Sequence, residues 1–482
     1  MTPEMSPELE WSRRNILRAA GITAIGLPLA ACASEPGTST GPTGSGGTAG
    51  GSVPVPEATF REPATKLSGS LTVLVWSHFV PSHDKWFDTF AKEWGTKVGV
   101  DVRIDHLDVG GIPAQIASEI QAGQGHDLLQ YIATLSQFEP GVLDLTDVTD
   151  EANKRYGKQL DICRESSFNP NTNVFYAYAP GWVPDPGDYR RSLWEPVGFA
   201  NGPATWDDLL KGASEIKKSQ NIQLGLGMSQ EIDSNMAGHA LLWSYGASVQ
   251  DANEKVTLNS PETIAAVEFM KRLYEGAMTP EVFSWNAASN NQGLVAGKLS
   301  YILNSISAWR TAQQASPKVA DDVFFTKALR GPKDARAAQH VLYNYVIPKH
   351  AKNPDAAKEF LLHYTDNWPL VTYHSKLYDF PSWSKLVPQL SGWLKNDPFG
   401  ANPRDKLAFL GGVDAAATWS ASIGHPGPSS PAIGEVIGTF VIPNMFARAA
   451  RGDMTPQQSV QTAHQECERI FSRWRQRGLV GG

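Results

Sequence analysis

The sequence predicts an α/β protein whose folded body forms two lobes. Short apolar runs typical of buried strands alternate with segments whose apolar residues recur at helical spacing. Helix-start signals continue along the rest of the chain. The chain has 482 residues, and the roughly 415 that follow a low-complexity N-terminal region are too many for one sheet with one core.

The alternation of strands and helices is clearest at the start of the folded body. Residues 70–76 (SLTVLVW) form an apolar run, as in a strand buried on both faces. The next segment is helical, with large apolar side chains on one face, among them Trp86, Phe90 and Trp94. Residues 100–107 and 127–132 are predicted strands, and 112–122 is a predicted helix ended by glycine. This order predicts right-handed crossovers and a parallel sheet.

Capping residues mark helix starts farther along. Thr205 is followed three residues later by Asp208, which is the pattern of a capping box. Ser260, Asn353 and Thr455 each precede a proline, which suits the first position of a helix. Short predicted strands lie between these helices at 223–227 and 299–303. The whole body is therefore predicted to be α/β.

The composition excludes several classes of protein. A net charge of −7 argues against a nucleic-acid binder, which needs a basic face. Three cysteines are too few for a disulfide framework or a cysteine-rich zinc site. The longest apolar run is shorter than the about 20 residues that span a bilayer. HExxH, P-loop and GxGxxG motifs are absent from the sequence, so no cofactor and no metal is predicted.

The N-terminus carries an export address. Arg13 and Arg14 precede an apolar stretch at 19–31, as in a twin-arginine signal, and LAAC at 29–32 resembles a lipobox. We expect residues 1–31 to be a signal peptide and Cys32 to be lipidated. Residues 32–66 then form a tether rich in Gly, Ser, Thr and Pro. The folded body is thus expected to be exported and anchored to the outer face of the cytoplasmic membrane, in the periplasm or at the cell surface.

Six groups of short motifs follow one another through the body. They are LTVLVWSH at 71–78 with GVDV at 99–102, IASEIQAG at 116–123 with HDLL at 126–129, PATWDDL at 203–209, VAGKLSY at 295–301, VIPK at 346–349 with 353–362, and ARGDMTP at 450–456. In this order they resemble the extracellular solute-binding proteins of ABC importers, a family that mostly captures carbohydrates. One stretch, 189–198, keeps only the outline of the family's pattern.

The resemblance implies a two-lobed periplasmic-binding-protein-like fold of type II, with a ligand cleft between lobes joined by hinge strands. It implies a first lobe at 67–178 and 345–378, and a second at 179–344 and 379–482. The implied function is capture of a mono- or oligosaccharide by hinge closure and its delivery to the transmembrane subunits of a permease, with no bond made or broken. We expect a monomer.

Candidate ligand residues follow mainly from the rule that ligands bind beyond the carboxyl ends of strands in open α/β sheets. Aromatic rings suit the apolar faces of a sugar, and amides and carboxylates suit its hydroxyl groups. Tyr178 and Trp182 are added because the family crosses between lobes there. The predicted ligand residues are Trp76, His78, Gln130, Tyr131, Tyr178, Trp182, Glu231, Trp285, Asn286, Asn304, Tyr343 and Asn344.

Three alternatives stay open. A surface-anchored glycan hydrolase would need two carboxylates flanking the scissile bond, and Glu231 with Asp233 is the nearest approach to such a pair. A binder of a polyol or phosphodiester is a second alternative, and for an anionic ligand Arg310 is the suggestive residue. His78, His83 and Asp84 form a conceivable metal site, although His83 and Asp84 are better explained as the opening of a helix.

The two remaining cysteines raise a separate question. Cys163 and Cys467 could pair in an oxidising compartment, or each could be an isolated thiol.

Overall fold

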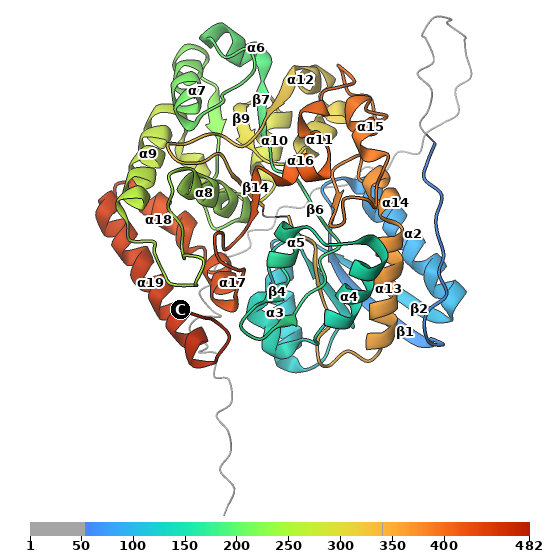
Figure 1. Cartoon of the computed structure of the whole chain (residues 1–482). Helices are drawn as coiled ribbons and strands as arrows, with labels where there is room; N and C mark the ends of the chain where they lie inside the picture. Colours follow the sequence, from blue (N-terminus) through green and yellow to red (C-terminus); the bar gives the residue numbers. More distant parts are fainter. Residues whose placement is uncertain (1–53, 340) are drawn as a thin grey trace, which may run out of the picture. The chain divides into compact units, whose positions relative to one another are not determined.

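The structure is a computed structural model that describes residues 54–339 and 341–482, and this part contains two four-stranded sheets (Figure 1). The predicted signal peptide, the lipidation site Cys32 and the first part of the tether lie outside the described residues. In the part that the structure describes, no helix is both long and apolar enough to cross a membrane.

The first sheet confirms the predicted strand–helix–strand order and extends it. Strands β1 (Gly69–Trp76), β2 (Val100–Leu107) and β3 (Leu128–Tyr131) are parallel, and α2 (Pro81–Val98) and α3 (Ile112–Ala122) connect them. The sheet order is β12-β3-β1-β2. Strand β12 (Asn344–Val346) pairs antiparallel with β3, so the sheet is mixed rather than wholly parallel. The sequence did not predict β12, because a three-residue strand shows no period.

The second sheet has the order β10-β7-β9-β8. Strands β8 (Gln223–Gly225) and β9 (Leu299–Leu303) are parallel, and both were predicted. Strand β7 (Gly187–Arg190) runs antiparallel to β9 and to β10 (Val323–Thr326). Mixed pairing in both sheets therefore corrects the expectation of a parallel sheet, while the α/β class is confirmed.

The predicted helix starts are confirmed by their caps. Helix α7 (Trp206–Gln220) begins with a capping box in which Thr205 Oγ1 accepts the N–H of Asp208 at 3.0 Å. Helices α9 (Pro261–Ala277), α13 (Pro354–Asp366) and α19 (Pro456–Gln476) begin at a proline behind a residue whose side chain accepts a backbone N–H.

The remaining elements fill in around the two sheets. The helices are α4 (Thr146–Tyr156), α5 (Asp161–Glu165), α6 (Arg191–Trp194), α8 (Ile232–Ser244), α10 (Ser289–Val295), α11 (Ser307–Ala315), α12 (Pro317–Asp322), α14 (Trp368–His374), α15 (Leu390–Lys395), α16 (Val413–Ala417), α17 (Pro431–Gly438) and α18 (Val441–Ala450). The short strands are β4 (Phe168–Asn169), β5 (Val174–Phe175), β6 (Gly181–Trp182), β11 (Ala337–Gln339), β13 (Phe380–Pro381) and β14 (Ser420–Ser422). The 3₁₀ turns are η1 (Ser136–Gly141), η2 (Glu195–Val197), η3 (Pro280–Phe283) and η4 (Ala408–Leu410).

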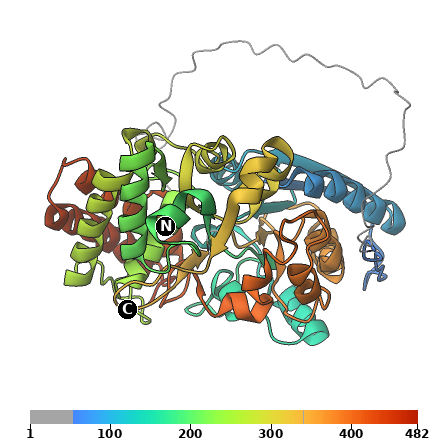
Figure 2. The same ribbon diagram turned by 90° about the horizontal axis from the view of Figure 1, so that it is seen from above.

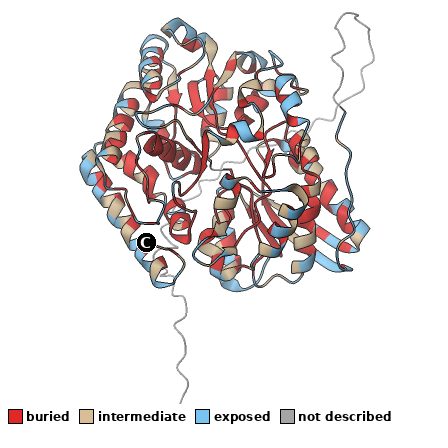
Figure 3. Cartoon of the chain, in the orientation of Figure 1, coloured by how far each residue is buried: buried red, intermediate tan, exposed pale blue. Residues whose placement is uncertain are grey.

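Buried apolar residues form a first core cluster around the first sheet and a second around α7, α8, α9, α18 and α19. Every residue of α8 is buried, as Figure 3 shows. Seen from above, the blue segment of α2 and the green helices near residues 200–280 lie at opposite ends of the folded body (Figure 2). Cys163 belongs to the first cluster and Cys467 to the second, and each is a separate buried thiol.

The chain crosses between the two sheets more than once. Tyr178 bridges to β12 of the first sheet, whereas β7, which starts at Gly187, belongs to the second. The chain returns from the second sheet to the first between β10 and β12. In the crossing region β6 pairs with β13, and Trp182 also bridges to Leu342. The exact limits of the two lobes remain a prediction.

Candidate ligand-binding site

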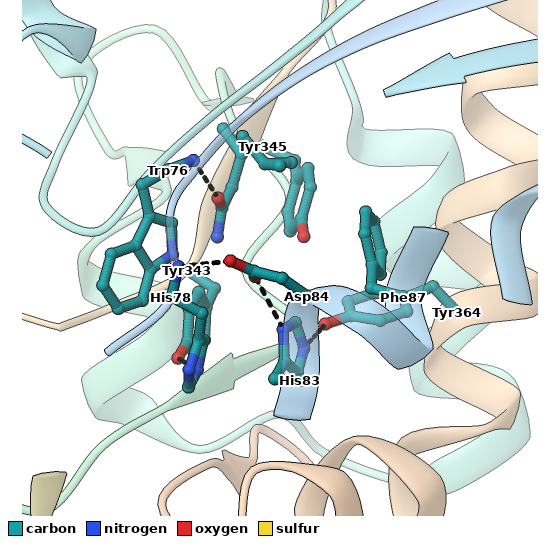
Figure 4. A pocket seen from close by; sticks show the side chains of 10 residues that line it. Trp76, His78, His83, Asp84, Phe87, Tyr343, Tyr345 and Tyr364 are labelled. Atoms are coloured by element: carbon teal, nitrogen blue, oxygen red, sulfur yellow. Dashed lines mark hydrogen bonds and ion pairs between the residues drawn. The ribbon is translucent and has the colours of Figure 1, made fainter. Parts of the chain in front are cut away.

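A small cavity lies at the carboxyl end of the first sheet. Its volume is about 10 Å³, close to the space that one water molecule needs. Four predicted ligand residues, which lie at or just beyond the end of β1, in β3 and just before β12, line it together with side chains of α2 and α13 (Figure 4). The lining residues are Val75, Trp76, His78, His83, Asp84, Phe87, Gln130, Tyr343, Tyr345 and Tyr364.

A hydrogen-bond network orients the polar groups beside this cavity. The Nδ1 atom of His78 accepts the backbone N–H of Val80 at 2.9 Å. The ring proton of neutral His78 must then sit on Nε2, which lies 3.4 Å from Oδ1 of Asp379. The Tyr343 hydroxyl donates to the same Asp379 oxygen and lies 3.3 Å from His78 Nε2. Gln130 Oε1 accepts the backbone N–H of Trp76 at 3.4 Å.

His78, His83 and Asp379 form a cluster whose donor atoms all lie within 4.8 Å of one another. The rings of His78 and His83 are stacked, with centroids 4.3 Å apart. Burial, and then the nearby His78, lowers the pKa of His83. In this structure His78 faces Asp379, and His83 Nε2 lies 3.3 Å from the Tyr364 hydroxyl, so these side chains take part in the hydrogen-bond network beside the cavity.

On the side of the second sheet, Glu231 caps helix α8. Its carboxylate accepts the backbone N–H groups of Asp233 and Ser234, each at 2.6 Å. Burial, followed by the charge of Asp233, raises the pKa of Glu231 to about 8. The Asp233 carboxylate accepts the side-chain amide of Asn290 at 2.8 Å. The amide of Asn304, beyond the end of β9, donates to Asn291.

The loop before α10 carries two predicted residues with different exposures. Trp285 is half-buried and packs against both core clusters. Its carbonyl accepts the hydroxyl of Ser229, which follows β8, at 2.7 Å. Asn286 is exposed, and its Oδ1 accepts the N–H of Ala288 at 3.0 Å, which shapes the start of α10. Trp285 thus lies between the two cores, whereas Asn286 is held in a local turn.

The other predicted residues lie in or beside the crossing segments. Tyr178 is fully buried, and its hydroxyl is 2.7 Å from Oγ1 of Thr365. Trp182 is also fully buried, and its indole N–H finds no acceptor within the described part of the chain. Half-buried Tyr131 stands opposite Asn344 in the β3–β12 ladder. The buried Asn344 amide donates to two backbone carbonyls, one of them Leu342 at 2.9 Å.

Tyr378 and Asp379, which the sequence did not single out, connect the two sides. The Tyr378 ring lies 5.1 Å from the ring of His78. Burial and the charges of Asp185, Asp379 and Asp233 raise the pKa of Tyr378 well above its usual value. Asp379 directly precedes β13, so the fold rather than any sequence spacing brings it to His78 and Tyr343. Only the adjacency of an aromatic and an acid in YDF at 378–380 could have indicated the pair.

Arg310 has a different role from the one considered for an anionic ligand. Its guanidinium and the carboxylate of Asp397 form an ion pair, with side chains that are 1% and 0% exposed. Its Nε also donates to the carbonyl of Lys376 at 2.8 Å, and it stacks on Trp309 at 4.3 Å. The charge of Arg310 is thus already neutralised inside the protein.

The chain passes more than once between two mixed sheets, and buried polar side chains lie at the carboxyl end of the first sheet. This arrangement is typical of solute-binding proteins, which close around a ligand by a hinge motion. The family model described as bacterial extracellular solute-binding protein matches residues 81–367, more than half of the chain. The chain belongs to this family, as its motifs indicated.

Curated relatives match over a shorter stretch. A Brucella abortus protein whose name describes a binding protein is 25% identical over 175 residues, which cover 36% of this chain and 42% of that one. A Deinococcus radiodurans protein named as an ABC transporter-binding protein is 24% identical over 193 residues, 38% of this chain and 46% of that one. The match thus spans less than half the length of these relatives.

Solved structures confirm the fold over most of the chain. Maltose-bound MalE3 of T. maritima gives a TM-score of 0.69 at 19% identity, covering 83% of this chain and 100% of that one. A sugar transporter of Arthrobacter chlorophenolicus with bound laminaribiose gives 0.68 at 15% identity, covering 83% and 99%. The acarbose-binding GacH receptor of Streptomyces glaucescens gives 0.65 at 16% identity, covering 84% and 98%. The predicted two-lobed periplasmic-binding-protein fold is confirmed.

Proposed function

We propose that this protein is the extracytoplasmic receptor of an ABC importer for a carbohydrate. It captures a mono- or oligosaccharide between its lobes by hinge closure and delivers the sugar unchanged to the permease. Family membership supports solute capture. The named ligands of the structural neighbours, maltose and laminaribiose among them, support a sugar.

One observation carries the choice of ligand. On the side of the first sheet, Trp76, Tyr343 and Gln130 line one cavity, so that aromatic rings and a buried amide lie together. Trp285, which packs against both core clusters, and buried Asn304 offer the same two kinds of side chain on the side of the second sheet. A sugar ring offers apolar C–H faces to aromatic rings and hydroxyl groups to amides and carboxylates. Each buried hydroxyl left without a partner would cost about 1–3 kcal/mol, which explains why both kinds of side chain are needed.

The proposal extends to the protein's place in the cell. The twin-arginine motif exports the chain, Cys32 receives lipid, and the tether up to residue 66 holds the receptor at the outer face of the cytoplasmic membrane. The receptor acts as a monomer. Its lobes comprise 67–178 with 345–378, and 179–344 with 379–482.

The alternatives have less support. In a hydrolase, Glu231 and Asp233 would flank a glycosidic bond, but Glu231 is held by two N–H groups of its own helix. A phosphodiester binder would need a cation in the site, and Arg310 is paired with Asp397. Capture without chemistry is therefore the better proposal.

The test uses purified protein that lacks residues 1–32. A thermal-shift screen over neutral sugars, polyols and small anions identifies the ligand, and titration calorimetry measures its affinity. Binding should raise Tm by mass action, equivalent to about 2.7 kcal/mol at a ligand concentration one hundred times Kd. Mass spectrometry should recover the sugar intact. Stabilisation by an anion alone, or a cleaved sugar, would contradict the proposal.

A matched pair of tryptophan variants localises the site. Trp285→Ala should weaken sugar binding at least tenfold, because this half-buried ring packs against both core clusters. Trp86→Ala is the control, since half-buried Trp86 stacks on His374 at 5.1 Å. It should lower Tm but keep the affinity. Equal affinities in both variants would show that Trp285 serves packing alone.

A further inference from the structure

Helix α17 joins two parts of the folded body that belong to different cores. It packs against α18 and α19 on one side (Figure 1) and against the turn η1 on another. Its apolar residues Ile433 and Val436 belong to the second core cluster. Leu135, which directly precedes η1, and Val142, which directly follows it, belong to the first cluster. The contact between α17 and η1 is therefore a seam between the two cores.

This seam lies at the edges of the sheets where the ligand is expected. Turn η1 begins shortly after the carboxyl end of β3, whose Gln130 lines the cavity. On the other side, the carbonyl of Ile437 in α17 accepts the side-chain amide of Asn235 at 3.3 Å. Asn235 lies near the start of α8, beyond the carboxyl end of β8. The seam thus connects the carboxyl ends of both sheets, the side on which open α/β sheets bind ligands.

Buried polar contacts hold the seam together. The hydroxyl of Ser136 donates to the carbonyl of Ser430 at 2.8 Å. The hydroxyl of Tyr176 lies 3.2 Å from the carbonyl oxygen of Ser429. All four residues are 0% exposed. Because buried polar groups in proteins keep hydrogen-bond partners, the direct contact of these groups marks a closed, water-free seam.

Gly434 allows α17 to approach η1 closely. A Cβ atom at this position would overlap Oε1 of Gln137 and would lie 2.7 Å from Oγ of Ser136. Half-buried Gln137 could turn aside, but the Ser136 oxygen could do so only by giving up its bond to Ser430. At Gly438, the last residue of α17, such a Cβ would meet no atom of the described residues beyond its own helix within 4 Å. The close fit is therefore specific to position 434.

We propose that α17 and η1 form a latch that holds the two lobes closed over the ligand site and slows the release of a bound sugar. Hinge motion that separates the carboxyl ends of the sheets opens the latch, and a sugar enters or leaves only then. The latch contacts involve none of the predicted ligand residues, so the latch acts on the release rate rather than on the choice of sugar. This inference rests on the proposed function, because it assigns a closing device to the same site.

A methyl group placed in the seam tests the latch. Gly434→Ala should push α17 away from η1, and because alanine favours a helix more than glycine does, loss of the helix is not the expected cause. Gly438→Ala makes the same change at the open position and is the matched control. Ser136→Ala removes the buried hydrogen bond without adding bulk, so it tests the latch independently of the wedge. Melting curves verify that each variant folds.

Two measurements are made on protein that lacks residues 1–32. The first is the distance between spin labels at Lys92→Cys on α2 and Lys218→Cys on α7, two exposed positions at opposite ends of the folded body, recorded without sugar by pulsed electron paramagnetic resonance (Figure 2). The second is the release rate of glucose, cellobiose or maltose in stopped-flow competition. Gly434→Ala and Ser136→Ala should lengthen the distance, and Gly434→Ala should speed release about tenfold. Gly438→Ala should match the parent in both measurements.

The outcomes separate the latch from the proposed function. If Gly434→Ala and Ser136→Ala fold and keep the parent's distances and release rate, the latch is wrong and the carbohydrate receptor stands. If Gly438→Ala changes both as much as Gly434→Ala does, the seam is not the cause and the latch is also wrong. If no saccharide of the thermal-shift screen binds, the carbohydrate function is overturned, and the distances alone decide whether α17 and η1 hold the lobes closed.

Discussion

Replacement of Arg310 by Met is expected to destabilise the folded body strongly. The guanidinium makes an ion pair with Asp397 in which both side chains are almost fully buried. Burial lowers the pKa of Arg310, and the Asp397 charge opposes that shift. The substitution leaves the aspartate charge buried without its guanidinium partner, although Oδ1 still accepts the backbone N–H groups of Phe399 and Ala401, at 2.6 and 3.4 Å.

The magnitude follows from this burial. Breaking a buried pair by removing one partner costs about 3–5 kcal/mol, far more than the median surface pair. The unfolding entropy of a body of about 430 residues is about 0.9 kcal/mol/K, so a loss of 4 kcal/mol lowers Tm by about 4 °C. The lost bonds to Lys376 and Gln313 add to this cost.

The assay is a double-mutant cycle measured by urea and thermal unfolding. Asp397→Asn keeps an oxygen that accepts the N–H of Phe399 while it removes the charge. The Arg310→Met/Asp397→Asn variant should therefore be about 2–3 kcal/mol more stable than the sum of the single losses predicts. Neutral-sugar affinity is measured on each folded variant and should stay within about threefold of the parent, which is about 0.7 kcal/mol.

One result would refute this reasoning. If Arg310→Met leaves Tm unchanged while it abolishes the binding of an anion such as glucose 6-phosphate, the guanidinium serves a ligand rather than the fold. The anionic-ligand alternative would then be restored.

Two further predictions concern titratable groups away from the ligand site. Burial lowers the pKa values of His239 and His363 to about 4, so the unfolded chain binds their protons more readily. Unfolding free energy should thus fall as pH drops from about 6.5 to 4, by up to about 1.4 kcal/mol per pH unit per group, and His363→Phe should flatten this slope in denaturant titrations. Burial raises the pKa of Cys163 to about 12 and also raises that of Cys467. A disulfide-exchange reagent should therefore modify neither thiol until urea unfolds the protein. Rapid labelling of the native protein would contradict the burial of the two thiols.

The elements that the sequence predicted most accurately have long apolar periods or strong caps. The strand at 100–107 and the helix at 112–122 are found at the expected residues, because eight to eleven residues give a clear period. Strands β7, β10 and β12 were not predicted. Each is three or four residues long, and its partner lies far along the chain. Pairing of that kind depends on tertiary structure, which local patterns do not encode.

The ligand site could be predicted only in part for a similar reason. Trp76, His78 and Gln130 follow from the rule about strand ends, and they line one cavity with Tyr343. Nothing in the local sequence distinguishes Asp379, because its contact with His78 joins residues 301 positions apart.

Asp379 links two side chains that line the cavity, His78 and Tyr343, to the segments that join the two sheets. It directly precedes β13, whose Phe380 pairs with Trp182 of β6 in the crossing region. Tyr343, which donates to Asp379, also bonds through its backbone N–H to the carbonyl of Gly181 at 3.0 Å. The segments that join the two sheets and the polar groups beside the cavity are therefore one connected structure. A ligand bound against His78 and Tyr343 would act directly on the strands that hinge closure must move, so under the proposed function recognition and closure depend on the same residues.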